Sequence, residues 1–129
     1  MSYMPPAKSD IHITPDNVFI EIWNQWGIYK EDFFDPCPLN PKFDGLNIDW
    51  KPLNYVNPPY SNLKDWVDKA YFETKQGRKT IMLLPSKTEQ GFFHFLLEKN
   101  YEIKWIRKRL KFKNNKHGAT QPHFLVLVQ

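Results

Sequence analysis

Apolar residues recur every three to four positions in three stretches of the chain, which is the spacing of an amphipathic helix. In the first stretch Val18 and Ile22 fall on one face. Thr14 can cap the N-terminus of this helix, Pro15 suits its first position, and Gly27 can end it. The spacing predicts helices over residues 14–26, 61–77 and 88–100.

Short apolar runs separate these stretches and indicate strands, because each run stops at a proline, glycine or amide residue. The run YEIKWIRKRLKF changes phase: Ile103 and Trp105 share one face, whereas Leu110 and Phe112 fall on the other. This change predicts a bulge or a kink near Arg107. We predict strands over residues 32–35, 53–56, 78–85, 101–112 and 123–128, the last two forming a terminal pair.

Strands that alternate with helices predict an α/β fold. A chain of 129 residues has the length of one domain, so we expect a loose arm over residues 1–10 and a single domain over residues 11–129. The first two predicted strands end at an acidic or amide residue followed by proline. Because ligands of open α/β sheets bind beyond the carboxyl ends of strands, we expect DPCP and NPPY to lie side by side on the ligand face.

Composition excludes several classes of site. Cys37 is the single cysteine, so an internal disulfide and a cysteine-based zinc site are both excluded. The four histidines show no metal-ligand spacing, and we expect no metal. No apolar run approaches the roughly 20 residues that cross a bilayer, and no leader pattern follows Met1. We therefore expect no membrane contact and a reducing, cytoplasmic setting.

Charge is divided unevenly along the chain. The formal net charge is +4, yet residues 99–117 contain eight basic residues and one acid. Residues 1–60 contain four lysines and eight acids. The division indicates two different partners on two faces, although a solvated lysine-rich hairpin explains the basic segment equally well on charge alone.

The segment Asn57-Pro58-Pro59-Tyr60 joins an amide, two prolines and an aromatic ring at the end of a predicted strand. Asn57 offers a side-chain carbonyl, and Pro58, held extended by the next proline, offers a main-chain carbonyl in a set direction. Two such acceptors can take both hydrogens of one amino group, and Tyr60 adds a flat face. The set favours a planar aromatic amine that attacks an electrophile. A stiff turn with Tyr60 in the core is the structural alternative.

The chain resembles small phage-type DNA adenine methyltransferases, which use S-adenosylmethionine and carry the NPPY amino-methyltransferase signature. The resemblance implies a minimal Rossmann-like sheet with helices on both faces and a C-terminal antiparallel hairpin. Only 21 residues lie between Asp35 and Asn57, so we expect some usual strands to be missing. The resemblance is carried by ordered motifs: TP at 14–15, DPCP at 35–38, DGL at 44–46, Trp50, VNPPYS at 56–61, WVDKA at 66–70, LLP at 83–85 and RLKF at 109–112.

The same resemblance implies roles for particular residues. Asn57, Pro58 and Tyr60 would hold the target adenine, and Pro59 would keep the loop stiff. Acids in the N-terminal half suit the sulfonium and ammonium groups of the cofactor. S-adenosylmethionine would be bound by Thr14, Pro15, Asp35, Pro36, Cys37, Asp44, Gly45, Leu46 and Asn57.

DNA is the partner that the basic segment would bind. The adenine amine is stacked inside a duplex, so the base must flip out or the substrate must be single-stranded. We expect Phe112 in the core, His117 in a solvent-facing loop, and, on size alone, a homodimer on duplex DNA. Phosphate contacts are expected from Arg107, Lys108, Arg109, Lys111, Lys113 and Lys116.

The predicted reaction is therefore methyl transfer from S-adenosylmethionine to the 6-amino group of adenine in DNA. RNA and a protein glutamine amide are alternative substrates, because NPPY suits any planar amine. A catalytically silent nucleic-acid-binding relative is a further alternative, since the segment before Asn57 is short. The resemblance also implies a viral or mobile-element origin, in which case the location is the host cytoplasm.

Overall fold

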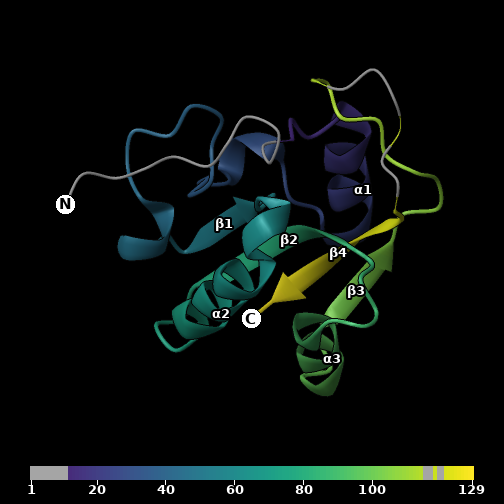
Figure 1. Cartoon of the computed structure of the whole chain (residues 1–129). Helices are drawn as coiled ribbons and strands as arrows, with labels where there is room; N and C mark the ends of the chain where they lie inside the picture. The colour runs from purple at the N-terminus through teal and green to yellow at the C-terminus, as the bar shows by residue number, and fades with distance from the viewer. Residues whose placement is uncertain (1–11, 115–117, 119–120) are drawn as a thin grey trace.

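The computed structural model describes residues 12–114, 118 and 121–129, and its centre is a four-stranded sheet (Figure 1). The strand order across the sheet is β1-β2-β4-β3. β1 and β2 are parallel, whereas β4 runs antiparallel to both of its neighbours. The strands are β1 Leu53–Val56, β2 Lys79–Pro85, β3 Glu102–Trp105 and β4 His123–Val128.

Helices cover both faces of this sheet, because the central strands are apolar on both sides. One face, which includes Ile81 and Leu83 of β2, packs against α1 (Asp16–Trp26). The other face, which includes Met82 and Leu84, packs against α2 (Leu63–Thr74) and α3 (Gly91–Glu98). The predicted α/β class with helices on both faces is confirmed. In the described part of the chain, no helix is long and apolar enough to cross a membrane.

The predicted first strand is wrong. In place of a strand over 32–35 there is a short 3-10 turn, Lys30–Asp32, followed by one parallel bridge between Phe34 and Asn54. That bridge consists of Phe34 N–H to the Leu53 carbonyl at 3.0 Å and Tyr55 N–H to the Phe34 carbonyl at 2.9 Å. Pairing stops there because the next residue whose N–H would point to β1 is Pro36, which has no N–H to donate.

The first helix begins later than the sequence predicts. Pro15 takes the N-cap position and Asp16 is the first helical residue. The hydroxyl of Thr14 makes no cap, because it is bonded to the Tyr55 hydroxyl at 2.8 Å. Gly27 ends the helix as expected, in a left-handed conformation with φ 69°.

The terminal strand pair is confirmed only for its first part. β3 ends at Trp105, and the basic residues that follow leave the sheet. Ile103 packs on the α2 and α3 side, whereas Leu110 and Phe112 are buried on the α1 side. The predicted change of face is thus correct, but it arises because the chain leaves the strand and crosses over the sheet end. Phe112 is in the core, as expected, and His117 lies outside the described residues.

Candidate active site

A pocket of about 200 Å³ opens at the carboxyl end of β1, beside the Phe34 bridge. Its walls include residues 12–14 before α1, the DPCP turn, and Asn57 and Pro59 of NPPY. DPCP and NPPY thus lie side by side as expected, although only NPPY follows a strand. The residues of most chemical interest in its lining are Thr14, Asp35, Pro36, Cys37, Asn57 and Pro59.

The amide of Asn57 is held in one orientation. Its Nδ2 donates to the main-chain oxygen of His12 at 2.7 Å and to Oγ1 of Thr14 at 3.1 Å. The Thr14 hydroxyl is in turn bonded to the buried hydroxyl of Tyr55. Because the amide nitrogen is committed to this side, Oδ1 faces the other way and is the atom of this amide that can accept a hydrogen bond. A substrate N–H can therefore be received without rotating the side chain.

The ring of Tyr60 is placed by contacts with two histidines. Its hydroxyl is hydrogen-bonded to Nε2 of His123, a buried residue at the start of β4. The His12 ring lies against it with centroids 4.4 Å apart, and His12 also contacts Phe112 at 4.7 Å. One face of the tyrosine is thus already covered by an aromatic ring of the chain itself, a contact the sequence did not predict.

Asp35 brings a carboxylate to the pocket, and Cys37 lies two residues further on. Oδ1 of Asp35 accepts the Cys37 main-chain N–H at 2.9 Å, which ties the turn together. The carboxyl can still be reached by solvent, but the pocket atoms around it remove much of its hydration, and this desolvation raises its pKa to about 6. Burial, together with the charge of Asp35, raises the pKa of the Cys37 thiol to about 12. Cys37 therefore stays protonated at neutral pH and is a poor nucleophile.

Residues 1–124 match the family described as DNA N-6-adenine-methyltransferase (Dam). The chain belongs to this family. Comparisons with curated proteins and with solved structures found no match. The family membership confirms the resemblance carried by the ordered motifs, and the family's description names methylation of adenine in DNA.

Other residues that the methyltransferase resemblance marks for the cofactor lie outside the pocket lining. Pro15 is buried at the start of α1. Asp44 caps a short 3-10 turn, Gly45–Asn47, by accepting the N–H of Leu46 at 3.1 Å. Gly45 lies directly against the Pro36 carbonyl and so supports the pocket wall from behind. Cofactor contacts of these four residues stay predictions.

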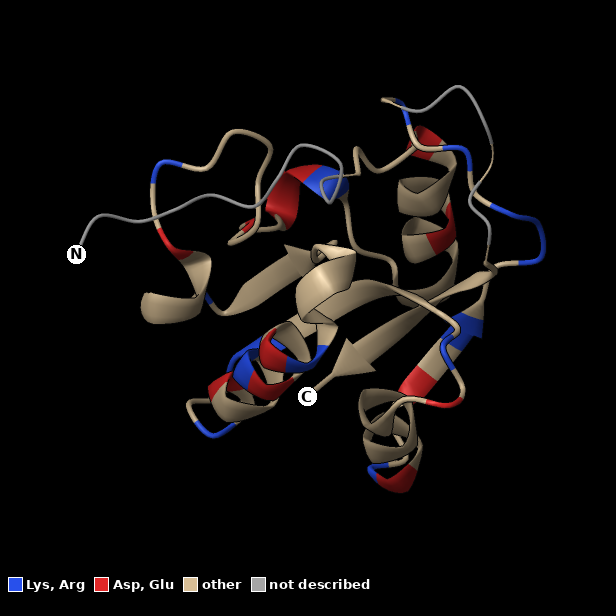
Figure 2. Ribbon diagram, in the orientation of Figure 1, with Lys and Arg blue, Asp and Glu red and all other residues tan. Residues whose placement is uncertain are grey.

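The basic segment after β3 forms a second hollow. Figure 2 shows its blue residues along the segment after β3, beside acidic residues of α1. Lys113 instead lines the first pocket and pairs with Asp16 at 2.8 Å, and Lys116 lies outside the described residues. A groove of about 410 Å³ is lined by Asn17, Glu21, Lys104, Arg107, Lys108, Arg109 and Lys111, among others.

Two site residues were missed by the sequence. His12 and His123 were considered only as metal ligands, and within the described ranges no group of three His, Cys, Asp or Glu residues is placed to hold a metal. His12 follows no local pattern that could have marked it. His123 could have been found from topology. β4 runs antiparallel to β2, so its first residue lies at the same end of the sheet as the carboxyl ends of the parallel strands β1 and β2.

Proposed function

We propose that this chain transfers a methyl group from S-adenosylmethionine to the 6-amino group of adenine in DNA. The observation that carries the proposal is the pocket whose lining includes both Asp35 and Asn57, within a chain of the adenine methyltransferase family. The pocket joins a carboxylate, suited to a cation, to a preoriented amide, suited to an aromatic amine.

The residues around the pocket fit the cofactor. Asp35 can pair with its ammonium or sulfonium group, and the rings of Phe19 and Trp66 offer apolar surface to its adenosine. S-adenosylmethionine, when bound, supplies a methyl group attached to a positively charged sulfur. A pocket of about 200 Å³ is smaller than the roughly 300–1,000 Å³ of most ligand sites, so we expect the pocket to widen on binding.

The chain's own residues act on the adenine amine. Oδ1 of Asn57 and the carbonyl of Pro58 accept its two hydrogens, which favours rehybridisation of the nitrogen and stabilises the positive charge that develops there. Pro58 and Pro59 are buried, and the extended conformation of Pro59 (φ −63°, ψ 140°) keeps the turn rigid. Tyr60 then provides the stacking surface next to the two acceptors. Neither acceptor takes a proton, so the proton released after transfer leaves to water.

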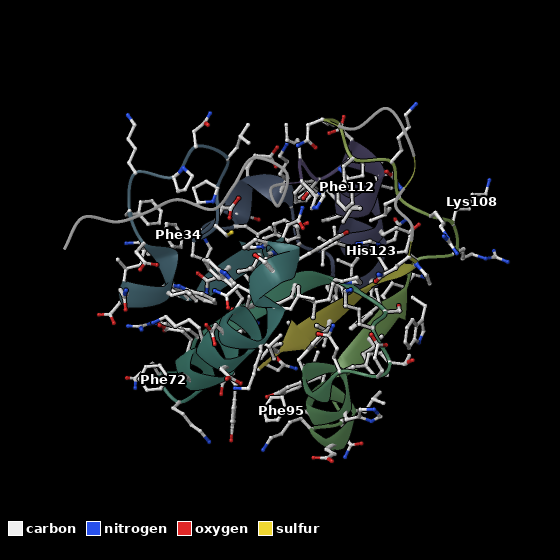
Figure 3. The ribbon with its side chains drawn as sticks, viewed as in Figure 1. Phe34, Phe72, Phe95, Lys108, Phe112 and His123 are labelled. Carbon is white, nitrogen blue, oxygen red and sulfur yellow. The ribbon has the colours of Figure 1, made fainter. Side chains whose placement is uncertain are left out.

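DNA would be held mainly by its phosphates. The target base has to leave the stack to reach a strand-end pocket, and the groove with Arg107, Lys108 and Lys111 supplies positive charge for the adjoining backbone. Figure 3 shows Lys108 extending away from the ribbon, in the position of a side chain available to a large partner. Site specificity and the homodimer belong to this proposal as expectations, and sedimentation with and without DNA would test the dimer.

Methyl transfer measured with labelled S-adenosylmethionine on DNA, RNA and bulk protein tests the function directly. Asn57→Ala removes one acceptor and should lower kcat on DNA by about 10²–10³-fold. Asn24→Ala, at an exposed position of α1, is the matched control and should act like the wild type. Equal rates for the two variants, or wild-type transfer to RNA or protein but not to DNA, would contradict the proposal.

The silent nucleic-acid-binding relative is the second candidate. The shortened first strand and the small pocket favour it, because both reduce the wall available to a cofactor. Calorimetry with S-adenosylmethionine separates the two: binding supports the enzyme, whereas DNA binding without cofactor binding supports the silent relative.

A further inference from the structure

The contact between Tyr60 and His123 joins two distant parts of the chain. Tyr60 opens the turn after β1, and His123 opens β4, which is separated from β1 by β2. The Tyr60 hydroxyl reaches across the end of β2 to Nε2 of His123. At that end, His123 is opposite Pro85 in the β2–β4 register. In the reaction proposed above, Asn57, Pro58 and Tyr60 act on the adenine, and His123 is given no part in it.

The partners of His123 determine which of its nitrogens carries the proton. Nδ1 lies 3.1 Å from the main-chain oxygen of Gln121, and a carbonyl can only accept, so Nδ1 is the N–H. Burial lowers the pKa of His123 to about 4, so the ring is neutral near pH 7 and Nε2 has a free lone pair. Burial also raises the pKa of the Tyr60 hydroxyl, which stays protonated and donates. The direction of the bond is therefore from Tyr60 to His123.

The imidazole is itself held firmly. His123 is 1% exposed and is anchored through the β2–β4 ladder. The Phe112 ring packs on it edge-on, with centroids 5.5 Å apart and planes at 74° (Figure 3). Phe112 comes from the end of the basic segment and is almost fully buried, so it also fixes where that segment returns to the domain. A rigid acceptor of this kind restricts rotation of the ring that hydrogen-bonds to it.

We propose that His123 is the positioning residue for Tyr60: its neutral imidazole accepts the tyrosine hydroxyl and sets the plane of the ring on which the target base stacks. This inference rests on the proposed function for its catalytic consequence. The hydrogen bond itself does not depend on that function. A stacking surface set before the base arrives stabilises the productive orientation without an ordering cost at that moment.

Nuclear magnetic resonance of the full-length chain with ¹⁵N-labelled histidine tests the hydrogen bond without any activity. His123 should show a protonated Nδ1 and an unprotonated Nε2, and Tyr60→Phe should move the Nε2 resonance. His94, whose Nε2 contacts the Thr88 carbonyl on the exposed side of α3, is the internal reference and should not change. A His123 ring protonated on Nε2, or an Nε2 resonance that ignores Tyr60→Phe, would overturn the proposal.

A double-mutant cycle tests the catalytic consequence. Tyr60→Phe and His123→Phe should each lower kcat on DNA by roughly threefold to tenfold, the effect of one neutral hydrogen bond, with KM for DNA within about twofold. The double variant should be no slower than Tyr60→Phe alone, because His123 acts through the hydroxyl. His94→Phe makes the same chemical change at an exposed site and should keep wild-type rates. Losses that multiply in the double variant would contradict positioning.

Folding and function are kept apart in this design. If His123→Phe does not fold, His123→Gln replaces it. The amide oxygen of glutamine can still accept from Tyr60, so kcat of this variant should stay closer to the wild-type value than kcat of Tyr60→Phe. An equal loss for His123→Gln in the wild-type and Tyr60→Phe backgrounds would again overturn the proposal. If the wild-type chain methylates no DNA although the hydrogen bond is present, the proposed function fails and the bond stands.

Discussion

Replacing Gly45 by alanine should disturb the pocket from behind. A Cβ at this position would lie 1.9 Å from the carbonyl oxygen of Pro36 and 2.8 Å from the ring of Trp66. Contacts of a Cβ below 3.0 Å are essentially never found, so the Pro36 carbonyl would have to move by about 1 Å. The main-chain carbonyl of Gly45 accepts the indole N–H of Trp50 at 2.7 Å, which limits how far Gly45 can move away from Pro36. The wall formed by Pro36 and its neighbours must yield instead.

The size of the effect follows from overpacking of a rigid site. Forcing one extra carbon into a packed site costs about 1–3 kcal/mol, and the more restricted unfolded chain of the alanine variant offsets at most about 1 kcal/mol of this. For a chain of this size the melting temperature should fall by roughly 3–10 °C. Because Pro36 lines the pocket, affinity for S-adenosylmethionine should fall about tenfold, or about 1.4 kcal/mol.

Gly91→Ala is the matched control. Gly91 is the first residue of α3, and an added Cβ there meets no atom within 4 Å. This variant should melt at or above the wild-type temperature, since alanine favours a helix over glycine. Thermal unfolding and calorimetry on both variants decide the matter. Indistinguishable melting temperatures and cofactor affinities would refute the idea that the Gly45–Pro36 contact supports the pocket.

Three further predictions concern the site and its partner. Ionisation of Asp35, whose pKa is raised to about 6, should strengthen binding of a cationic cofactor as the pH rises from about 5 to 7. In calorimetry Asp35→Asn should flatten this pH dependence, and a wild-type affinity that falls over this range would contradict the prediction. DNA affinity should drop steeply with salt, and Lys108→Ala should reduce the slope of log K against log salt by about one, whereas Lys64→Ala on α2 should not. Thr14→Val should lower kcat by roughly threefold to tenfold because Asn57 loses one of its two anchors, and Thr14→Ser should restore it; equal rates for valine and serine would argue against the anchor.

Much of the fold could be predicted because it is encoded locally. The three helices follow from apolar spacing, and β1, β2 and β4 follow from short apolar runs that end at a proline or an amide residue. The failures lie where pairing partners decide the outcome. Residues 32–35 look like a strand, but Pro36 limits them to one bridge. Residues 107–112 alternate like a strand, but the chain leaves β3 at Trp105.

The candidate site could be predicted from the sequence only in part. NPPY could be placed at the end of β1 and DPCP beside it, because their prolines mark where each apolar run stops. The orientation of the Asn57 amide could not, since it depends on atoms of His12 and Thr14 more than 40 positions earlier in the chain. The same applies to Tyr60, whose hydroxyl partner lies 63 positions later.

The sequence by itself determined which groups the candidate site contains: an amide, two prolines and a tyrosine, whose local geometry suits an aromatic amine. Only the tertiary structure decided how these groups are oriented. It brought His12, Thr14 and His123 to the strand ends, oriented the Asn57 oxygen, and gave Tyr60 a neutral acceptor. The physical reason is that hydrogen bonds act over about 3 Å, whereas the residues that make them here are joined only by the folding of the sheet.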